Sequence, residues 1–265
     1  MSWKEVLGRV SFSNCNPVFM GISDHWKVFS APPSWLCGHV LRRDCIAAPI
    51  PTADYAKHRD ELVLLPDLAI VSRGSTGSVL IFGNRPIENM RDIAVPTDSS
   101  SSRQLLDWIL EQKGLDPRRV EMAPDLGQML EECDGALIIG DRALLESKSN
   151  PNLVIMDLGE EWTKQTSMPM VFGVFAARKD TDSIFVSKAH SDMVGQLEKF
   201  YNDPLWRSEL IKQTSKLTGL SETRLDNYYS SEVWNMLDPN AIEGLDLYLK
   251  LVCGVSEGAT WAKLN

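Results

Sequence analysis

The sequence predicts an α/β protein. In the middle of the chain, the apolar runs Ile93–Val95 and Gly135–Ile139 are each followed by a helical pattern, as in a parallel α/β domain. The stretch Pro169–Arg178 is the most hydrophobic strand pattern and is long enough to run from one domain into another. From Ile184 onward the pattern is helical, which predicts that this segment wraps a domain formed earlier in the chain.

Size and composition agree with two lobes of this class. The chain has 265 residues, of which 43% are hydrophobic and 24% charged, the balance of a globular protein with a substantial core. We expect lobe I to comprise residues 1–83 and 176–265, and lobe II residues 84–175. The chain would then pass from lobe I to lobe II near Phe82 and return to lobe I near Met170.

The first third of the chain alternates strand and helix patterns. A polar loop, 13–17, leaves the first strand, and a glycine-hydroxyl loop, 74–78, precedes the last one. In order, we expect a strand at Val10–Phe12, a helix within Pro32–Arg43, a strand at Cys45–Pro51, a helix capped by Thr52, a strand at Leu62–Val71 and a strand at Val79–Phe82.

Two polar residues at strand ends are candidate ligand contacts. Asn14 follows the first strand, at the carboxyl edge where open α/β sheets place their ligands; the alternative is an asparagine that only shapes the turn. Ser78 begins the strand Val79–Phe82, where the alternative is a hairpin turn. The neighbouring Cys15 is interpreted as a small semi-buried thiol rather than a nucleophile, because the local pattern places no histidine beside it.

The hydroxyl-rich run Thr97–Ser102 lies between a strand and the helical pattern Arg103–Leu110. The first backbone N–H groups of a helix lack partners, and its N-terminus carries partial positive charge. Ser99, Ser101 and Ser102 are therefore predicted to bind a carboxylate or phosphate. The alternatives are an ordinary serine N-cap and a flexible surface loop.

Gly140 ends a second buried strand, and Asp141 follows it at the start of a helix. We include both among the candidate ligand contacts, although the favoured interpretation of Asp141 alone is a helix cap. Further on, Asp157–Trp162 is expected to form a short loop and turn.

Charge and motif content restrict the class of function. The net charge of −9 without a basic stripe argues against nucleic acid, and an anionic ligand would need local positive potential. The sequence contains no P-loop, no G-x-S-x-G elbow, no GxGxxG after a strand and no metal spacing of its histidines, so we expect no cofactor and no metal. Five scattered cysteines and the absence of a signal-like or membrane-spanning apolar run predict a cytoplasmic protein.

A series of short motifs in register resembles the chorismate dehydratase family, which acts first in the futalosine route to menaquinone. The motifs are Asn14-Cys15-x-Pro17, Ala48-Pro49-Ile50-Pro51, Leu65–Ile70, Ser78-Val79-Leu80, Ser99-x-Ser101-Ser102, Leu137–Leu144, Asp157-Leu158-Gly159-x-x-Trp162 and Pro169–Phe172. Ile46, Ser100 and the run Thr166–Pro169 depart from the family pattern, which usually has aspartate, arginine and T-G-L-P there.

The resemblance implies a type II periplasmic-binding-protein fold with a ligand cleft between the lobes. It also implies that chorismate loses its ring hydroxyl and a ring proton to give 3-enolpyruvyl-benzoate. Asn14 would then act at the reacting centre, the serine run would hold one carboxylate, and Ser78 would assist from the other lobe. Arg73 and Arg178 are considered as further ligand contacts.

Two alternatives remain at this point. The first is an enzyme like the sister family that forms dihydroxynaphthoate. The second is an intracellular protein that binds a small carboxylate without turning it over.

Overall fold

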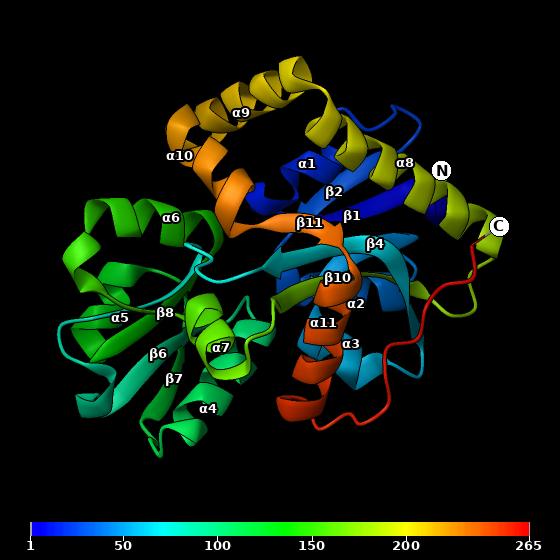
Figure 1. Ribbon diagram of the computed structural model, residues 1–265. Coiled ribbons are helices and arrows are strands. Elements are labelled where there is room, and N and C mark those ends of the chain that lie inside the picture. The colour runs from blue at the N-terminus through cyan, green and yellow to red at the C-terminus, as the bar shows by residue number, and fades with distance from the viewer. Residues whose placement is uncertain (1, 265) are drawn as a thin grey trace.

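The computed structural model describes residues 2–264, which fold into two α/β lobes lying side by side (Figure 1). The larger lobe contains a six-stranded sheet of order β11-β4-β10-β3-β1-β2, and the smaller lobe a five-stranded sheet of order β7-β6-β8-β5-β9. The predicted α/β class is confirmed by these two mixed sheets and the helices that cover them.

The larger sheet combines parallel and antiparallel pairs. Strand β1 pairs parallel with β2 and β3, whereas β10 pairs antiparallel with β3 and β4, and β11 with β4. Every residue of β3 is buried, as its unbroken apolar run requires of a strand covered on both faces. The strands are β1 Val6–Val10, β2 Lys27–Ala31, β3 Ala47–Pro51, β4 Leu62–Ser72, β10 Met170–Arg178 and β11 Trp234–Leu237.

The helices of the larger lobe come from both ends of the chain. In Figure 1, α8 and α9 lie above its sheet, while α2, α3 and α11 lie below it. They are η1 Trp3–Glu5, η2 Ser13–Cys15, α1 Asn16–Phe19, α2 Pro33–Leu41, α3 Thr52–His58, α8 Ser183–Asn202, α9 Pro204–Thr218, α10 Glu222–Asn227, the π-helical turn η5 Tyr228–Glu232 and α11 Pro239–Leu251.

The smaller sheet has a parallel half and an antiparallel half. Strand β6 pairs parallel with β7 and β8, and β5 pairs antiparallel with β8 and β9. The strands are β5 Val79–Gly83, β6 Asp92–Pro96, β7 Arg118–Met122, β8 Gly135–Ile139 and β9 Val154–Asp157. The helices are η3 Ile87–Asn89, α4 Ser101–Gln112, α5 Leu126–Glu132, α6 Gly140–Ser149, η4 Pro151–Leu153 and α7 Leu158–Thr166.

The lobe boundaries differ from those expected. Because β5 pairs only within the smaller sheet and β10 lies in the larger one, the chain crosses between the lobes at residues 73–78 and 167–169. The expected boundaries after residues 83 and 175 therefore put one strand on the wrong side at each crossing. An apolar run identifies a buried strand, but only its hydrogen-bonded neighbours decide to which sheet it belongs.

Three local expectations are also corrected. The first strand ends at Val10, so that Phe12 lies outside it. The segment expected as a loop after Asp157 forms helix α7. The Asp157 carboxylate caps this helix, because it accepts hydrogen bonds from the backbone N–H groups of Gly159 and Glu160 at 2.9 and 3.1 Å. Thr52 does not cap α3, because its hydroxyl donates to the carbonyl of Val171 at 2.7 Å.

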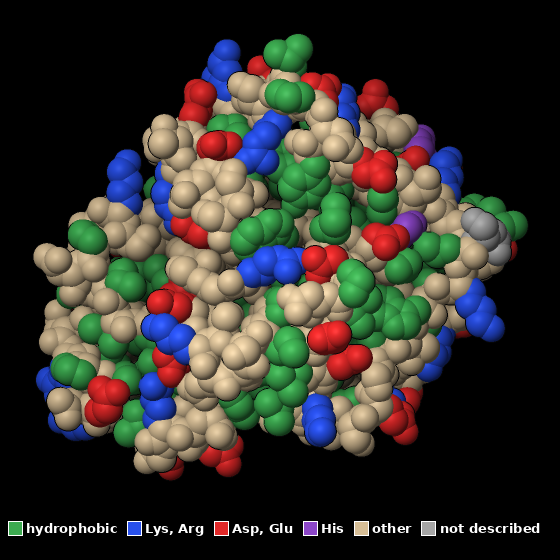
Figure 2. Space-filling model, viewed as in Figure 1, with side chains coloured by type: hydrophobic (Ala, Val, Ile, Leu, Met, Phe, Trp, Pro, Cys, Tyr) green, Lys and Arg blue, Asp and Glu red, His purple; other side chains and the backbone are tan. Residues whose placement is uncertain are grey.

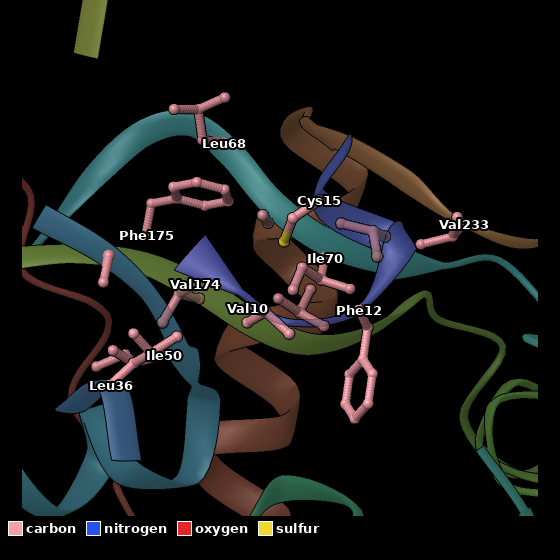
Figure 3. Packing of buried hydrophobic residues seen from close by; sticks show 14 of the residues in the cluster. Val10, Phe12, Cys15, Leu36, Ile50, Leu68, Ile70, Val174, Phe175 and Val233 are labelled. Carbon is pink, nitrogen blue, oxygen red and sulfur yellow. The ribbon is translucent and has the colours of Figure 1, made fainter. Parts of the chain in front are cut away.

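The hydrophobic core is continuous from one lobe to the other. Along β5 and β8 the side chains alternate: Ile81 and Leu137 join the large cluster that extends into the larger lobe, while Leu80 and Ile138 face a smaller cluster on the opposite side of the sheet. In Figure 3, Val10 and Ile70 lie within the packed cluster of the larger lobe.

The surface carries mixed charge. Figure 2 shows basic and acidic side chains interspersed over one face of the molecule. Among residues 2–264, no helix is long and apolar enough to cross a membrane.

Phe12 and Gly140 make a close contact between the lobes. The Phe12 side chain extends away from the core cluster of its own lobe (Figure 3), and α6 of the other lobe begins at Gly140 with φ of +66°. A Cβ atom on Gly140 would lie 2.5 Å from the Phe12 ring. Glycine is therefore required at this position both for its backbone conformation and for the approach of the aromatic ring.

We predict that Gly140→Ala lowers the free energy of unfolding by more than Gly114→Ala does. Gly114 has the same φ of +66° but open space around it, so alanine there adds only the backbone strain, about 1–2 kcal/mol. At Gly140 the Phe12 ring must also move. Urea unfolding of both variants measures the difference, and equal losses would show that the lobe contact is loose.

Candidate functional site

A cleft between the lobes brings most of the predicted ligand contacts together. It encloses about 600 Å³ including its open mouth. Six of the seven predicted residues line it: Asn14, Ser78, Ser99, Ser101, Ser102 and Gly140. Asp141 is not among the lining residues.

The cleft wall is apolar and uncharged. Its hydrophobic part comes from both lobes and includes Ile50, Ile70, Val79, Phe172 and Val233, a surface suited to a small carbon ring. No charged side chain is found among the lining residues within the described chain, 2–264. Positive potential at the cleft comes instead from the starts of α4 and α6, neither of which is capped by a side chain, although the Gly140 N–H at the start of α6 donates to the Ser78 carbonyl at 2.7 Å.

The serine run uses its hydroxyls differently from one residue to the next. Ser101 Oγ accepts a hydrogen bond from the backbone N–H of Ala53 at 3.2 Å, which links the two lobes. The hydroxyls of Ser99 and Ser102 have no partner within residues 2–264 and remain available to a ligand. Ser100 precedes α4 without a side-chain cap bond, so the N-cap alternative is wrong.

Asn14 carries an unpaired polar atom at the cleft. It lies in the short helical turn η2, within the segment 13–17 that the sequence predicted as a polar loop, and Pro17 lies in the first turn of α1. Its Oδ1 atom is buried and has no hydrogen-bond partner in the described part of the chain. A buried acceptor without a partner costs about 1–3 kcal/mol, so a hydrogen-bond donor placed beside this oxygen would be stabilising.

Asp141 reaches across to the other lobe instead of capping its own helix. The cap position of α6 is Ile139, and the Asp141 carboxylate accepts from the Ser13 backbone N–H at 3.0 Å on each oxygen and from Ser13 Oγ at 2.5 Å. Burial raises the pKa of Asp141, an effect that the bonds from Ser13 oppose. The carboxylate thus holds the residue that directly precedes Asn14.

Ser13 is held from a third direction as well. The hydroxyl of Tyr229 donates to the Ser13 carbonyl oxygen at 2.8 Å. The N–H, the hydroxyl and the carbonyl of Ser13 are therefore all bonded, and the backbone that carries Asn14 is fixed from both lobes.

Sequence reasoning missed several residues that shape the cleft. Thr76 lines it and lies 3.0 Å from the Ser78 hydroxyl, oxygen to oxygen. The Asp157 carboxylate accepts from the N–H groups of Thr76 and Gly77 at 2.9 and 2.7 Å, which shapes the crossing segment ahead of Ser78. The glycine-hydroxyl loop 74–78 was the only indication in the sequence, whereas Asp157, the partner that shapes it, lies about eighty residues later in the chain.

The departures from the family pattern lie outside the cleft. Ile46 is fully buried in the hydrophobic core. Ser100 turns its hydroxyl toward Asp54, whose pKa is raised by burial while the bond from Ser100 lowers it. Neither residue lines the cleft, so neither contacts a ligand bound there.

The two arginines considered as ligand contacts are engaged elsewhere. Arg73 pairs with Asp238, and Arg178 bonds to Asp180 at 2.9 Å and to the Leu41 carbonyl at 2.9 Å. Neither is among the lining residues of the cleft.

Cys15 is not suited to act as a nucleophile. The thiol is fully buried, and burial raises its pKa to about 12, which keeps it protonated. Within residues 2–264, no group of three or more His, Cys, Asp or Glu side chains is arranged to hold a metal ion.

Comparisons with known proteins agree in family and fold. The family model described as menaquinone biosynthesis matches residues 6–253. A chorismate dehydratase from Thermus thermophilus is 30% identical over 192 residues, which cover 66% of this chain and 70% of that protein.

Solved structures are similar in fold. A protein from Archaeoglobus fulgidus superposes with a TM-score of 0.72 at 19% identity, covering 94% of this chain and 95% of that one. A Candida albicans protein described as having the generic periplasmic binding protein fold gives a TM-score of 0.66 at 15% identity, covering 98% and 97%. The predicted periplasmic-binding-protein-like fold is thereby confirmed.

We predict that Asp141→Ala speeds amide hydrogen exchange in the peptide Ser11–Phe19 by at least about tenfold. Hydrogen bonds to a charged acceptor contribute about 1.5–3 kcal/mol, and each 1.4 kcal/mol is about tenfold in an equilibrium. Exchange measured by mass spectrometry tests this directly.

The matched control is Asp125→Ala. Asp125 also accepts a backbone N–H at a helix start, from Gln128 at 2.9 Å, but it contacts only its own lobe. This variant should leave the peptide Ser11–Phe19 unchanged. An equal effect of the two variants, or none from Asp141→Ala, would mean that the carboxylate does not hold Ser13.

Proposed function

The chain belongs to the menaquinone biosynthesis family, and from that premise we propose that it is a chorismate dehydratase. The proposed reaction converts chorismate to 3-enolpyruvyl-benzoate and water, which makes the enzyme a hydro-lyase. The observation that carries the proposal is the neutral cleft in which the buried Asn14 Oδ1 lacks a partner and serine hydroxyls converge.

The chemistry needs little from the protein beyond position and environment. Chorismate loses its ring hydroxyl and the proton on the neighbouring ring carbon; the electron pair of that C–H bond enters the ring, and the two leave together as water. The proton is vinylogous to the ring carboxylate and the product is aromatic, so the driving force lies in the substrate. Orientation by fixed donors and exclusion of water are the contributions left to the cleft.

We assign one carboxylate of the substrate to Ser99, Ser101 and Ser102, with the N-terminus of α4 behind them. Gly140 brings the start of α6 to the same cleft. Asp141 contributes through Ser13 rather than by contact with the ligand. The apolar wall would cover the ring.

Asn14 is the polar contribution of the larger lobe. Ser78 was expected to assist from the lobe opposite the serine run, but β5 belongs to the smaller sheet, so Ser78 lies on the same side as the serines. Asn14 alone among the proposed contacts faces them from across the cleft. We therefore place Asn14 either at the leaving hydroxyl, whose O–H can donate to Oδ1, or at a carboxylate next to the reacting carbon, which the Nδ2 amide group would bind.

The proposal assigns the role of base to the substrate. No side chain with a titratable acid or base group is among the described residues that line the cleft. The enolpyruvyl carboxylate of chorismate lies close to the ring proton and can accept it, and then pass it to the departing hydroxyl group so that water leaves and the carboxylate is regenerated. The free thiols of all five cysteines accord with the cytoplasmic location that we propose for this enzyme.

The test is incubation of the purified chain with chorismate. Aromatisation changes the ultraviolet spectrum, and mass spectrometry identifies a product lighter by one water. Asn14→Ala should lower kcat by about 100-fold or more, the usual loss when a fixed donor or acceptor is removed from a reacting centre. Ser100→Ala, whose hydroxyl faces Asp54 outside the cleft, should retain normal turnover.

Two outcomes would overturn the proposal in different ways. Thermal stabilisation by chorismate that stays chemically unchanged would indicate a binding protein without turnover. Chorismate that is neither bound nor converted would indicate another step of the pathway, such as formation of dihydroxynaphthoate. Normal turnover by Asn14→Ala would show that Asn14 does not act at the reacting centre.

A further inference from the structure

Behind the cleft, a buried tyrosine contacts one of the serines that line it. Tyr228 is fully buried, and its hydroxyl donates to Ser78 Oγ at 3.0 Å. It is the first residue of the π-helical turn Tyr228–Glu232, in which the next residue, Tyr229, bonds to Ser13. Such turns often occur at functional sites, and here two consecutive tyrosines reach two different cleft residues.

The Tyr228 hydroxyl is the donor in this hydrogen bond. Burial raises the pKa of Tyr228 well above its usual value, so the phenol keeps its proton. Among the described residues, Ser78 Oγ is the partner of that hydroxyl. With Tyr228 as the donor and Ser78 as the acceptor, the proton of Ser78 itself points elsewhere.

Two directions are open to the Ser78 proton. One is Thr76 Oγ1, at 3.0 Å, which also lines the cleft, and the other is the cleft itself. A carboxylate accepts hydrogen bonds and has no proton to donate, so its arrival would draw the Ser78 proton into the cleft.

Ser101 shows the same arrangement. Its oxygen accepts from the N–H of Ala53 in the other lobe, so its proton is also directed away from that donor. Both serines line the cleft. Donors placed behind two hydroxyls turn both of them into donors toward the bound molecule.

We propose that Tyr228 is a positioning residue that sets the Ser78 hydroxyl as a hydrogen-bond donor to a carboxylate of the substrate. The inference rests on the proposed function for the identity of that substrate. It adds the recognition rule that the cleft selects groups that only accept hydrogen bonds, and it assigns part of that selection to the C-terminal segment of the chain.

The first experiment is a double-mutant cycle on chorismate turnover. Tyr228→Phe removes one hydroxyl, and we expect it to raise KM about tenfold with a smaller change in kcat. We expect Ser78→Ala to raise KM in the same way. The variant with both substitutions should be no worse than Ser78→Ala, because Tyr228 acts through Ser78. Additive effects, or an unchanged KM in Tyr228→Phe, would overturn the inference.

Tyr55→Phe is the matched control. Tyr55 is equally buried, and its hydroxyl accepts from the backbone N–H of Thr260 at 2.7 Å, a bond away from the cleft. This variant controls for loss of a buried hydroxyl and should keep the KM of the unmodified chain. A rise in KM equal to that of Tyr228→Phe would mean that the effect is only structural.

A binding measurement separates this inference from the proposed function. Calorimetry with benzoate and benzamide compares an acceptor-only group with one that also donates. The unmodified chain should bind benzoate more tightly, and Tyr228→Phe should lose that preference while Tyr55→Phe retains it. If chorismate is not converted but this pattern holds, the function fails and the inference stands; if chorismate is converted and the preference is absent or unaltered in Tyr228→Phe, the inference fails alone.

Discussion

The contact between Asp141 and Ser13 is the constraint on which the cleft depends. It joins the start of α6 in the smaller lobe to the turn after β1 in the larger lobe through bonds of 2.5–3.0 Å. Because Tyr229 binds the remaining polar group of Ser13, the backbone cannot rotate without breaking bonds on both sides. Asn14 is the next residue. Its position relative to the serines is therefore determined by closure of the lobes, and the Phe12 ring packed against Gly140 reinforces the same closure.

A neutral cleft is consistent with a substrate that supplies its own base. An arginine or lysine against the enolpyruvyl carboxylate would bind it tightly but would also lower its pKa and weaken it as a proton acceptor. An apolar wall has the opposite effect, since burial raises the pKa of a carboxylate. Arg142, a cation near this region, pairs with Asp98 and lies over the Phe12 ring, 5.4 Å from its centroid. Hydroxyls and helix ends can orient a carboxylate without a full opposing charge.

The sequence was sufficient for the fold class and for most of the polar side chains that line the cleft, because both depend on local pattern. Strand ends, helix starts and hydroxyl runs can be recognised within ten residues, and Asn14, Ser78 and the serine run were recognised in this way. The role of Asp141 could not be predicted, because its partner Ser13 is 128 residues away. The lobe boundaries failed for a related reason: the hydrophobicity of β5 and β10 is a local property, whereas their sheet membership is not. The catalytic and binding roles themselves remain proposals.

The C-terminal segment contributes contacts to the site that its local sequence pattern could not predict. Its helical pattern predicted only that it wraps a domain. Its helices do cover the larger lobe, but residues Trp234–Leu237 also form β11, a strand of the larger sheet that the pattern did not predict. Yet Tyr228, Tyr229 and Tyr248 donate to Ser78, Ser13 and Ser101, three residues at or next to the cleft. Each tyrosine is almost completely buried, so its ring contributes to the core while its hydroxyl satisfies a polar group behind the site. Since these bonds span 147 to 216 residues of sequence, the hydroxyls and carbonyls around the ligand acquire their orientation only when the last quarter of the chain has packed against both lobes. The orientation of the polar groups in the cleft therefore depends on the whole fold.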